Sequence, residues 1–143
     1  MSETTLNPQI LGQAERAHGA LLDRKLTGTG LAYHDWVALT LIVGGRLDVD
    51  GLIATIAGAV KIDTASARNV LDELAAAQLI EADGSALRLT GEGRATYDRL
   101  RESVDATIGS LYAGIPADEL ATAGRVVALL TTRANAELLR DVA

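Results

Sequence analysis

The stretch from Ile62 to Arg94 constrains the fold of this chain more than any other. After a polar turn comes a helical segment whose apolar residues recur at i, i+3, i+4 and i+7, namely Ala67, Val70, Leu71 and Leu74. Two short extended segments follow, 79–82 and 86–89, separated by turn-forming residues at 83–85. A further helix begins near Thr90, whose hydroxyl suits an N-cap. The order helix, hairpin, helix predicts the core of a winged helix-turn-helix.

Helical patterns also occupy both sides of this stretch. Apolar spacing predicts helices over about 8–26, 34–43 and 49–60, a long helix from Thr90 to about Tyr112, and a last helix that Pro116 opens in its first turn. The fold class predicted is therefore mainly α with a small β-hairpin wing, a winged helix-turn-helix core flanked by long N- and C-terminal dimerisation helices.

The terminal helices exceed what a winged helix needs, so their apolar stripes require a partner, and a symmetric homodimer supplies one. We expect a single unit over residues 1–143. Within it we expect a winged helix-turn-helix lobe at 31–92 and a helical dimerisation region formed by 6–28 and 93–143.

Composition excludes several classes of protein. Lys and Arg number 13 against 19 Asp and Glu, and the net charge of −6 argues against a general nucleic-acid coat or a membrane-surface protein. The absence of cysteine excludes disulfides, thiol catalysis and cysteine-ligated metals. No apolar run is long enough to span a bilayer, and no secretory signal is visible, so we expect a cytoplasmic protein with no membrane partner.

The order and spacing of four segments resemble the MarR (multiple antibiotic resistance regulator) family. These segments are 30–39, 62–80, 87–100 and 114–120, and they include the phrase LTGEG at 89–93 on the exit from the hairpin. The resemblance implies a homodimer with interlocking terminal helices, in which each subunit presents a winged helix to a pseudo-palindromic operator. It also implies that a small phenolic or aromatic ligand often releases the DNA.

The hairpin departs from the family pattern. Members usually carry an acidic-basic-basic motif in the wing, whereas the tip here, residues 81–86, is shorter and has two acids and no base. Gln78 stands where the family usually has a glycine before the first strand. From Lys61 to Arg94 there are four basic and six acidic residues, a balance of −2 on the segment expected to touch phosphate. Either the recognition helix reads the operator largely alone, or this chain binds DNA weakly.

The candidate DNA-binding residues lie on the recognition helix and around the wing. The N-terminal turns of a recognition helix reach base edges, where Arg can bind guanine and Asn adenine through paired hydrogen bonds. The set comprises Thr64, Ser66, Arg68, Asn69, Arg88 and Arg94. The alternative for the four helix residues is an N-cap and an ordinary solvated face. For the two wing arginines it is solvation or an ion pair with Glu81 or Glu92.

A second group could bind a ligand. Tyr33, His34 and Trp36 bunch at the start of the second helix, near where family members bind effectors, and an aromatic wall with a histidine suits a phenol or carboxylate. The core alternative is stronger for Trp36, and His34 could simply cap the helix. His18, on the first helix, is the last of this set and more often an interface residue than a ligand.

The function predicted is a dimeric DNA-binding transcriptional regulator, a ligand-responsive repressor that binds double-stranded DNA. The alternative is a family member with weak or no DNA binding that acts as a ligand- or protein-binding dimer. Neither a catalytic grouping nor a phosphate loop stands out, so we expect no enzyme, and with two histidines and no cysteine we expect no metal site and no cofactor.

Overall fold

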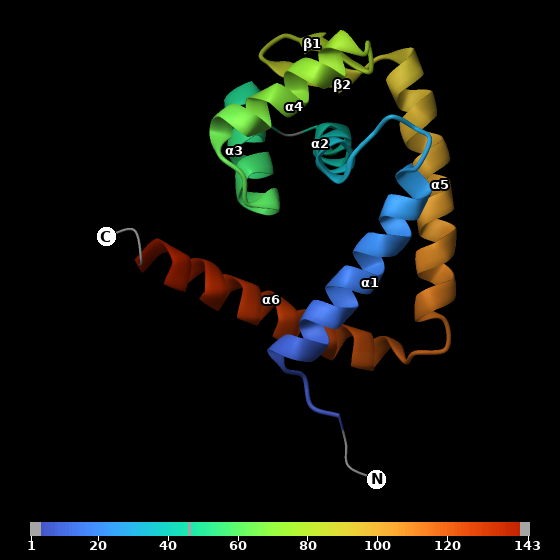
Figure 1. Ribbon diagram of the computed structural model, residues 1–143, viewed down its shortest axis with the longest axis vertical. Coiled ribbons are helices and arrows are strands. Elements are labelled where there is room, and N and C mark those ends of the chain that lie inside the picture. The colour runs from blue at the N-terminus through green and yellow to red at the C-terminus, as the bar shows by residue number, and fades with distance from the viewer. Residues whose placement is uncertain (1–3, 46, 141–143) are drawn as a thin grey trace. The chain divides into compact units, whose positions relative to one another are not determined.

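The computed structural model describes residues 4–45 and 47–140, which form six helices and one hairpin (Figure 1). The helices and strands are, in order, α1 (Pro8–Leu26), α2 (Tyr33–Gly44), α3 (Val49–Val60), α4 (Thr64–Ala76), β1 (Ile80–Asp83), β2 (Ala86–Leu89), α5 (Gly91–Tyr112) and α6 (Ala117–Arg140). The chain divides into two compact units, residues 1–105 and 106–143, and the division falls within α5. None of the helices in the described part is long and apolar enough to cross a membrane.

The core of the first unit gathers the inward faces of α2, α3 and α4 against the hairpin and the first turns of α5. The apolar stripe predicted for α4 is buried as expected, and α2 buries most of one side. The residues with the least exposure are Leu26, Trp36, Ala38, Leu39, Ile42, Leu52, Ile53, Ile56, Ala67, Val70, Leu71, Leu74, Leu79, Ile80, Tyr97 and Leu100. No buried residue of this core is polar or charged, so its stability rests on apolar burial.

The turn between α3 and α4 fixes how the recognition helix begins. Lys61 ends α3 with a left-handed backbone, φ 57°, and the Ile62 amide donates to the Ala57 carbonyl. Asp63 then caps α4, since its carboxylate accepts from the Ser66 amide at 2.6 Å.

The hairpin is a tight antiparallel pair in which Ile80 faces Leu89 and Asp83 faces Ala86. Its loop is only Gly84-Ser85, and the left-handed φ of 63° at Gly84 is the geometry of a type II′ turn. The Ser85 carbonyl accepts from the Val49 amide at 3.0 Å, which ties the tip to the start of α3. The wing is therefore fastened at its tip as well as at its base.

A close backbone approach joins the hairpin to α5. The Thr90 hydroxyl accepts from the Gly93 amide at 3.0 Å, the N-cap expected from the sequence, and donates to the Gln78 carbonyl at 2.7 Å. The Leu79 carbonyl accepts from the Thr90 amide and lies directly over Gly93. A Cβ at Gly93 would stand 2.8 Å from the Leu79 carbonyl carbon and closer still to its oxygen. The second glycine of LTGEG is thus required by packing.

The second unit consists of the end of α5 and α6. No residue of α6 is buried, and four members of its i, i+4 row are apolar: Val126, Leu130, Ala134 and Leu138. Exposed apolar side chains also occupy the end of α5, at Ile108, Leu111 and Tyr112. The last residues of the dimerisation region expected from the sequence, 141–143, lie outside the described residues.

Several expected boundaries needed small corrections. The first strand is Ile80–Asp83 instead of 79–82. Leu79 is not part of the strand because its amide donates to the Leu74 carbonyl at the end of α4. Pro116 precedes α6 instead of opening its first turn, and its carbonyl accepts from the Leu120 amide at 3.1 Å. His34 does not cap α2: the cap position is Ala32, whose amide donates to the Asp35 carboxylate at 2.8 Å.

Candidate nucleic-acid interface

The four candidate residues of the recognition helix lie on its exposed side. Thr64, Ser66, Arg68 and Asn69 are all exposed, because the buried stripe of α4 turns the opposite way. They occupy the first two turns, which is the part of such a helix that reaches base edges. Helical spacing makes neighbours of Thr64 and Arg68, and of Ser66 and Asn69, at the two sides of this exposed face.

Arg68 and Asn69 have no hydrogen-bond or ion-pair partner within residues 4–45 and 47–140. Asp72 lies one turn further on, yet no ion pair joins it to Arg68. The guanidinium and the carboxamide are therefore free to meet an external partner without first breaking an internal contact.

The N-terminus of α4 is already occupied by an anion. The Ser66 amide and hydroxyl donate to the Asp63 carboxylate and hold its pKa below the ordinary value, with a smaller contribution from the Ala65 amide. The cap thus uses donors that a helix N-terminus could otherwise offer to a phosphate. The Ser66 amide is therefore not available to a phosphate, and side chains near this turn are the better candidates for phosphate contacts.

The two wing-region arginines are engaged with acids. Arg88 lies opposite Glu81 in the hairpin register, and its Nε is 3.0 Å from the Glu81 carboxylate. The Arg94 Nη1 is 3.9 Å from the Asp98 Oδ1, one turn along α5, and Arg94 is not paired with Glu92. Both pairs are well exposed, so they are weak and open to competition. The two arginines lie on separate elements from α4, on β2 and α5.

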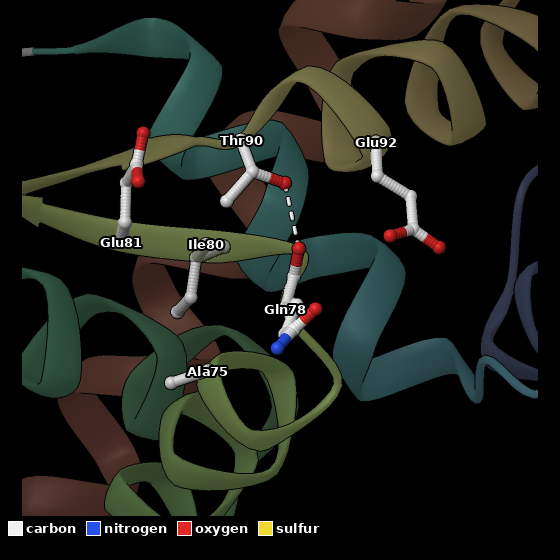
Figure 2. Close-up of a pocket in the computed structure, with 6 residues that line it drawn as sticks. All are labelled: Ala75, Gln78, Ile80, Glu81, Thr90 and Glu92. Atoms are coloured by element: carbon white, nitrogen blue, oxygen red, sulfur yellow. Dashed lines mark hydrogen bonds between the residues drawn. The ribbon is translucent and has the colours of Figure 1, made fainter.

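A shallow hollow of about 430 Å³ lies where α4 ends, β1 begins and α5 starts (Figure 2). Its lining is mixed, comprising Ala75, Gln78, Ile80, Glu81, Thr90 and Glu92. Figure 2 shows the Thr90 hydroxyl turned toward the Gln78 carbonyl. No aromatic side chain lines this hollow, and none of the four candidate ligand residues does.

Those ligand candidates are divided between core and surface. Trp36 is buried and stacks on Tyr97 with ring centroids 5.2 Å apart, so it packs the lobe against α5. Tyr33 is 46 % exposed, and its ring centroid lies 6.1 Å from that of the half-buried His34. His18 is exposed on α1, with its Nδ1 2.7 Å from the Ala14 carbonyl oxygen. Only Tyr33 and His34 form a neighbouring pair that a small molecule could touch.

Sequence reasoning missed one structurally important residue, Tyr97, and noticed a second, Gln78, without predicting its conformation. Tyr97 is the stacking partner of Trp36, 61 positions away, and no local pattern announces a contact at such a separation. Gln78 has a left-handed backbone, φ 64°. The family usually has a glycine at this position, and glycine favours the left-handed conformation. The usual glycine was therefore the sequence signal for a left-handed backbone at Gln78. Within the described ranges, no three His, Asp or Glu side chains are placed so as to hold a metal ion.

No protein-family model and no curated protein matches the chain, but many solved structures share its fold. Ligand-free NadR is 23 % identical, with a TM-score of 0.74 over 92 % of this chain and 98 % of NadR. NadR in complex with 4-hydroxyphenylacetate is 22 % identical, with a TM-score of 0.71 over 91 % and 95 %. A MarR-family transcriptional regulator from Silicibacter pomeroyi is 26 % identical, with a TM-score of 0.66 over 90 % and 88 %. The chain has the fold of the MarR family, as the sequence resemblance implied.

Proposed function

We propose that this chain, which has the MarR-family fold, is a dimeric DNA-binding transcriptional regulator that acts in the cytoplasm. One observation carries the proposal: the first two turns of α4 present Arg68 and Asn69, exposed and unpartnered in the described part of the chain. Arginine and asparagine are the side chains best suited to guanine and adenine in the major groove. Thr64, a neighbour of Arg68 on the helix, supplies a hydroxyl for phosphate or base, and Ser66 supplies one where it gives up its hydrogen bond to Asp63. No catalytic activity is proposed.

The mechanism would be steric repression. Two copies related by a two-fold axis would place two α4 helices about one helical turn of DNA apart, on the half-sites of a pseudo-palindromic operator. A ligand that holds the two helices at another spacing would lower the affinity for DNA. NadR has been solved with 4-hydroxyphenylacetate, and we propose a phenolic or aromatic effector here as well, near the exposed Tyr33 and His34. The buried Trp36 would form the back of such a site, and His18 is the remaining candidate.

The test is a titration of the protein against the DNA upstream of its own gene at several salt concentrations. Arg68→Ala should weaken specific binding by about 1–3 kcal/mol while changing non-specific binding much less. Arg24→Ala, which removes the same charge from the exposed last turn of α1, is the matched control. If wild-type protein forms no sequence-specific complex at low salt, the regulator proposal fails. If Arg68→Ala and Arg24→Ala behave alike, the assignment of Arg68 fails.

A second candidate function is a dimer that binds a ligand or protein and has lost its affinity for DNA. The observation in its favour is the wing, where Glu81 occupies Arg88 and Asp83 adds a further negative charge. Calorimetric titration of phenolic acids and of DNA into the same preparation separates the two candidates. Ligand binding without any DNA complex would favour this second function.

A further inference from the structure

The hairpin carries three charged side chains, Glu81, Asp83 and Arg88. Glu81 and Arg88 are direct cross-strand partners, joined by an Nε to carboxylate contact of 3.0 Å. Glu81 and Asp83 are two residues apart on β1, so strand alternation places them on the same face of the hairpin. The Asp83 side chain has no hydrogen bond or ion pair as far as the structure describes the chain. Two equal charges therefore share one face, and only one of them holds the arginine.

We propose that Glu81 sets how strongly the wing engages DNA phosphate, by acting as the internal counter-ion of Arg88. The inference rests on the proposed function, because it concerns the same DNA-binding surface. Glu81 holds the Nε–H of Arg88, so a phosphate that binds the guanidinium through Nε must displace the Glu81 carboxylate. Displacement then leaves an unpaired carboxylate next to a phosphate, and the two negative charges repel each other.

The competition is graded and not absolute. The Arg88 and Glu81 side chains are 60 % and 48 % exposed, and ion pairs that are this accessible to water are individually weak. Phosphate can therefore displace Glu81, at a cost in affinity of about two- to fivefold for each wing. Glu81 thus tunes the contribution of the wing, and the reading of bases is left to α4.

The chain offers a matched control for this proposal. Glu81→Gln and Asp83→Asn each remove one negative charge from the same strand face, and each keeps a side chain of nearly the same shape. Only Glu81→Gln removes the charge that is paired with Arg88, and it leaves at most a weaker neutral hydrogen bond to the guanidinium. Any difference between the two variants therefore reports the release of the arginine and not the general loss of repulsion.

The experiment measures the dissociation constant of each variant for a duplex of arbitrary sequence between about 50 and 200 mM KCl, where phosphate contacts dominate. Asp83→Asn should bind somewhat more tightly with an unchanged salt slope. Glu81→Gln should bind about two- to fivefold more tightly still, with a slope steeper by up to about 0.9 per subunit, because a phosphate contact that forms only in part in the wild type becomes complete. The double variant Glu81→Gln/Arg88→Ala should lose both gains.

Other outcomes overturn the proposal in different ways. Equal affinities and slopes for Glu81→Gln and Asp83→Asn would show that only total charge matters. A gain that survives in the double variant would show that Arg88 is not the group released. If neither the wild-type protein nor any variant binds duplex DNA at 50 mM KCl, the proposed function fails together with this inference. If wild-type protein binds its upstream DNA specifically while the two single variants match, only the inference fails.

Discussion

Gln78 occupies a backbone conformation that favours glycine. Its φ is 64°, and it follows the end of α4 in a Schellman arrangement, with the Leu79 amide donating to the Leu74 carbonyl and the Gln78 amide to the Ala75 carbonyl. The buried Leu74 and Leu79 provide the apolar contact that usually accompanies this motif. A side chain with a Cβ in the left-handed region costs about 1–2 kcal/mol, so the surrounding contacts must hold Gln78 there.

Gln78→Gly should therefore stabilise the protein. The variant relieves the left-handed conformation, but it also increases the freedom of the unfolded chain, so we expect a net gain of about 0.5–1 kcal/mol. Urea denaturation at one protein concentration measures it. Ala77→Gly is the control, because Ala77 is right-handed, φ −78°, and should lose about 0.5–1 kcal/mol through the same unfolded-state effect. A loss of stability in Gln78→Gly comparable to that in Ala77→Gly would contradict the prediction.

At the scale of the helices and strands, local rules predicted most of the fold. The bounds of α1 and α3 agree with the sequence prediction, because Asn7 and Asp48 cap their starts and apolar spacing runs to the end of each helix. The exposed face of α4 also follows from its buried stripe. The partner of Arg88 could not be predicted, since Glu81 and Glu92 were both compatible with the sequence and only the strand register selects Glu81. Which acid pairs with Arg88 depends on the pairing of the two strands and not on the spacing of residues along the chain.

The junction between the hairpin and α5 depends on a missing side chain. In Gly93→Ala the new methyl group would overlap the Leu79 carbonyl, which is backbone and already bonded to the Thr90 amide. The junction would have to open, at a cost of about 2–3 kcal/mol or more. Gly91→Ala is the control, because a Cβ there meets nothing within 4 Å. Thermal unfolding followed by circular dichroism should show a large drop in Tm for the first variant and little change for the second, and similar values for both would refute the close packing.

At the scale of the whole molecule, the apolar surface of the second unit remains to be explained. Val126 is 36 % exposed, Leu130 39 % and Leu138 55 %, and these three lie on one row of α6. Such a row is typical of a helix face that packs against another apolar surface. Burial of such side chains is the main source of the free energy of association. The proposed homodimer would cover it. The sequence indicated the row by its spacing, but which copy covers it is a property of two chains and not of one.

Leu130→Glu tests that assembly, because it places a charge in the middle of the apolar row. If a second copy covers the row, an unpaired carboxylate would have to be buried there, and the dimer should dissociate to a folded monomer or lose its fold altogether. Thr132→Glu is the matched control, since Thr132 is exposed on α6 two residues away and outside the row. Sedimentation velocity should give a dimer for wild type and for Thr132→Glu, and a smaller or unfolded species for Leu130→Glu. A wild-type protein that sediments as a folded monomer would rule out the dimer, and a Leu130→Glu protein that stays dimeric would move the interface away from this row.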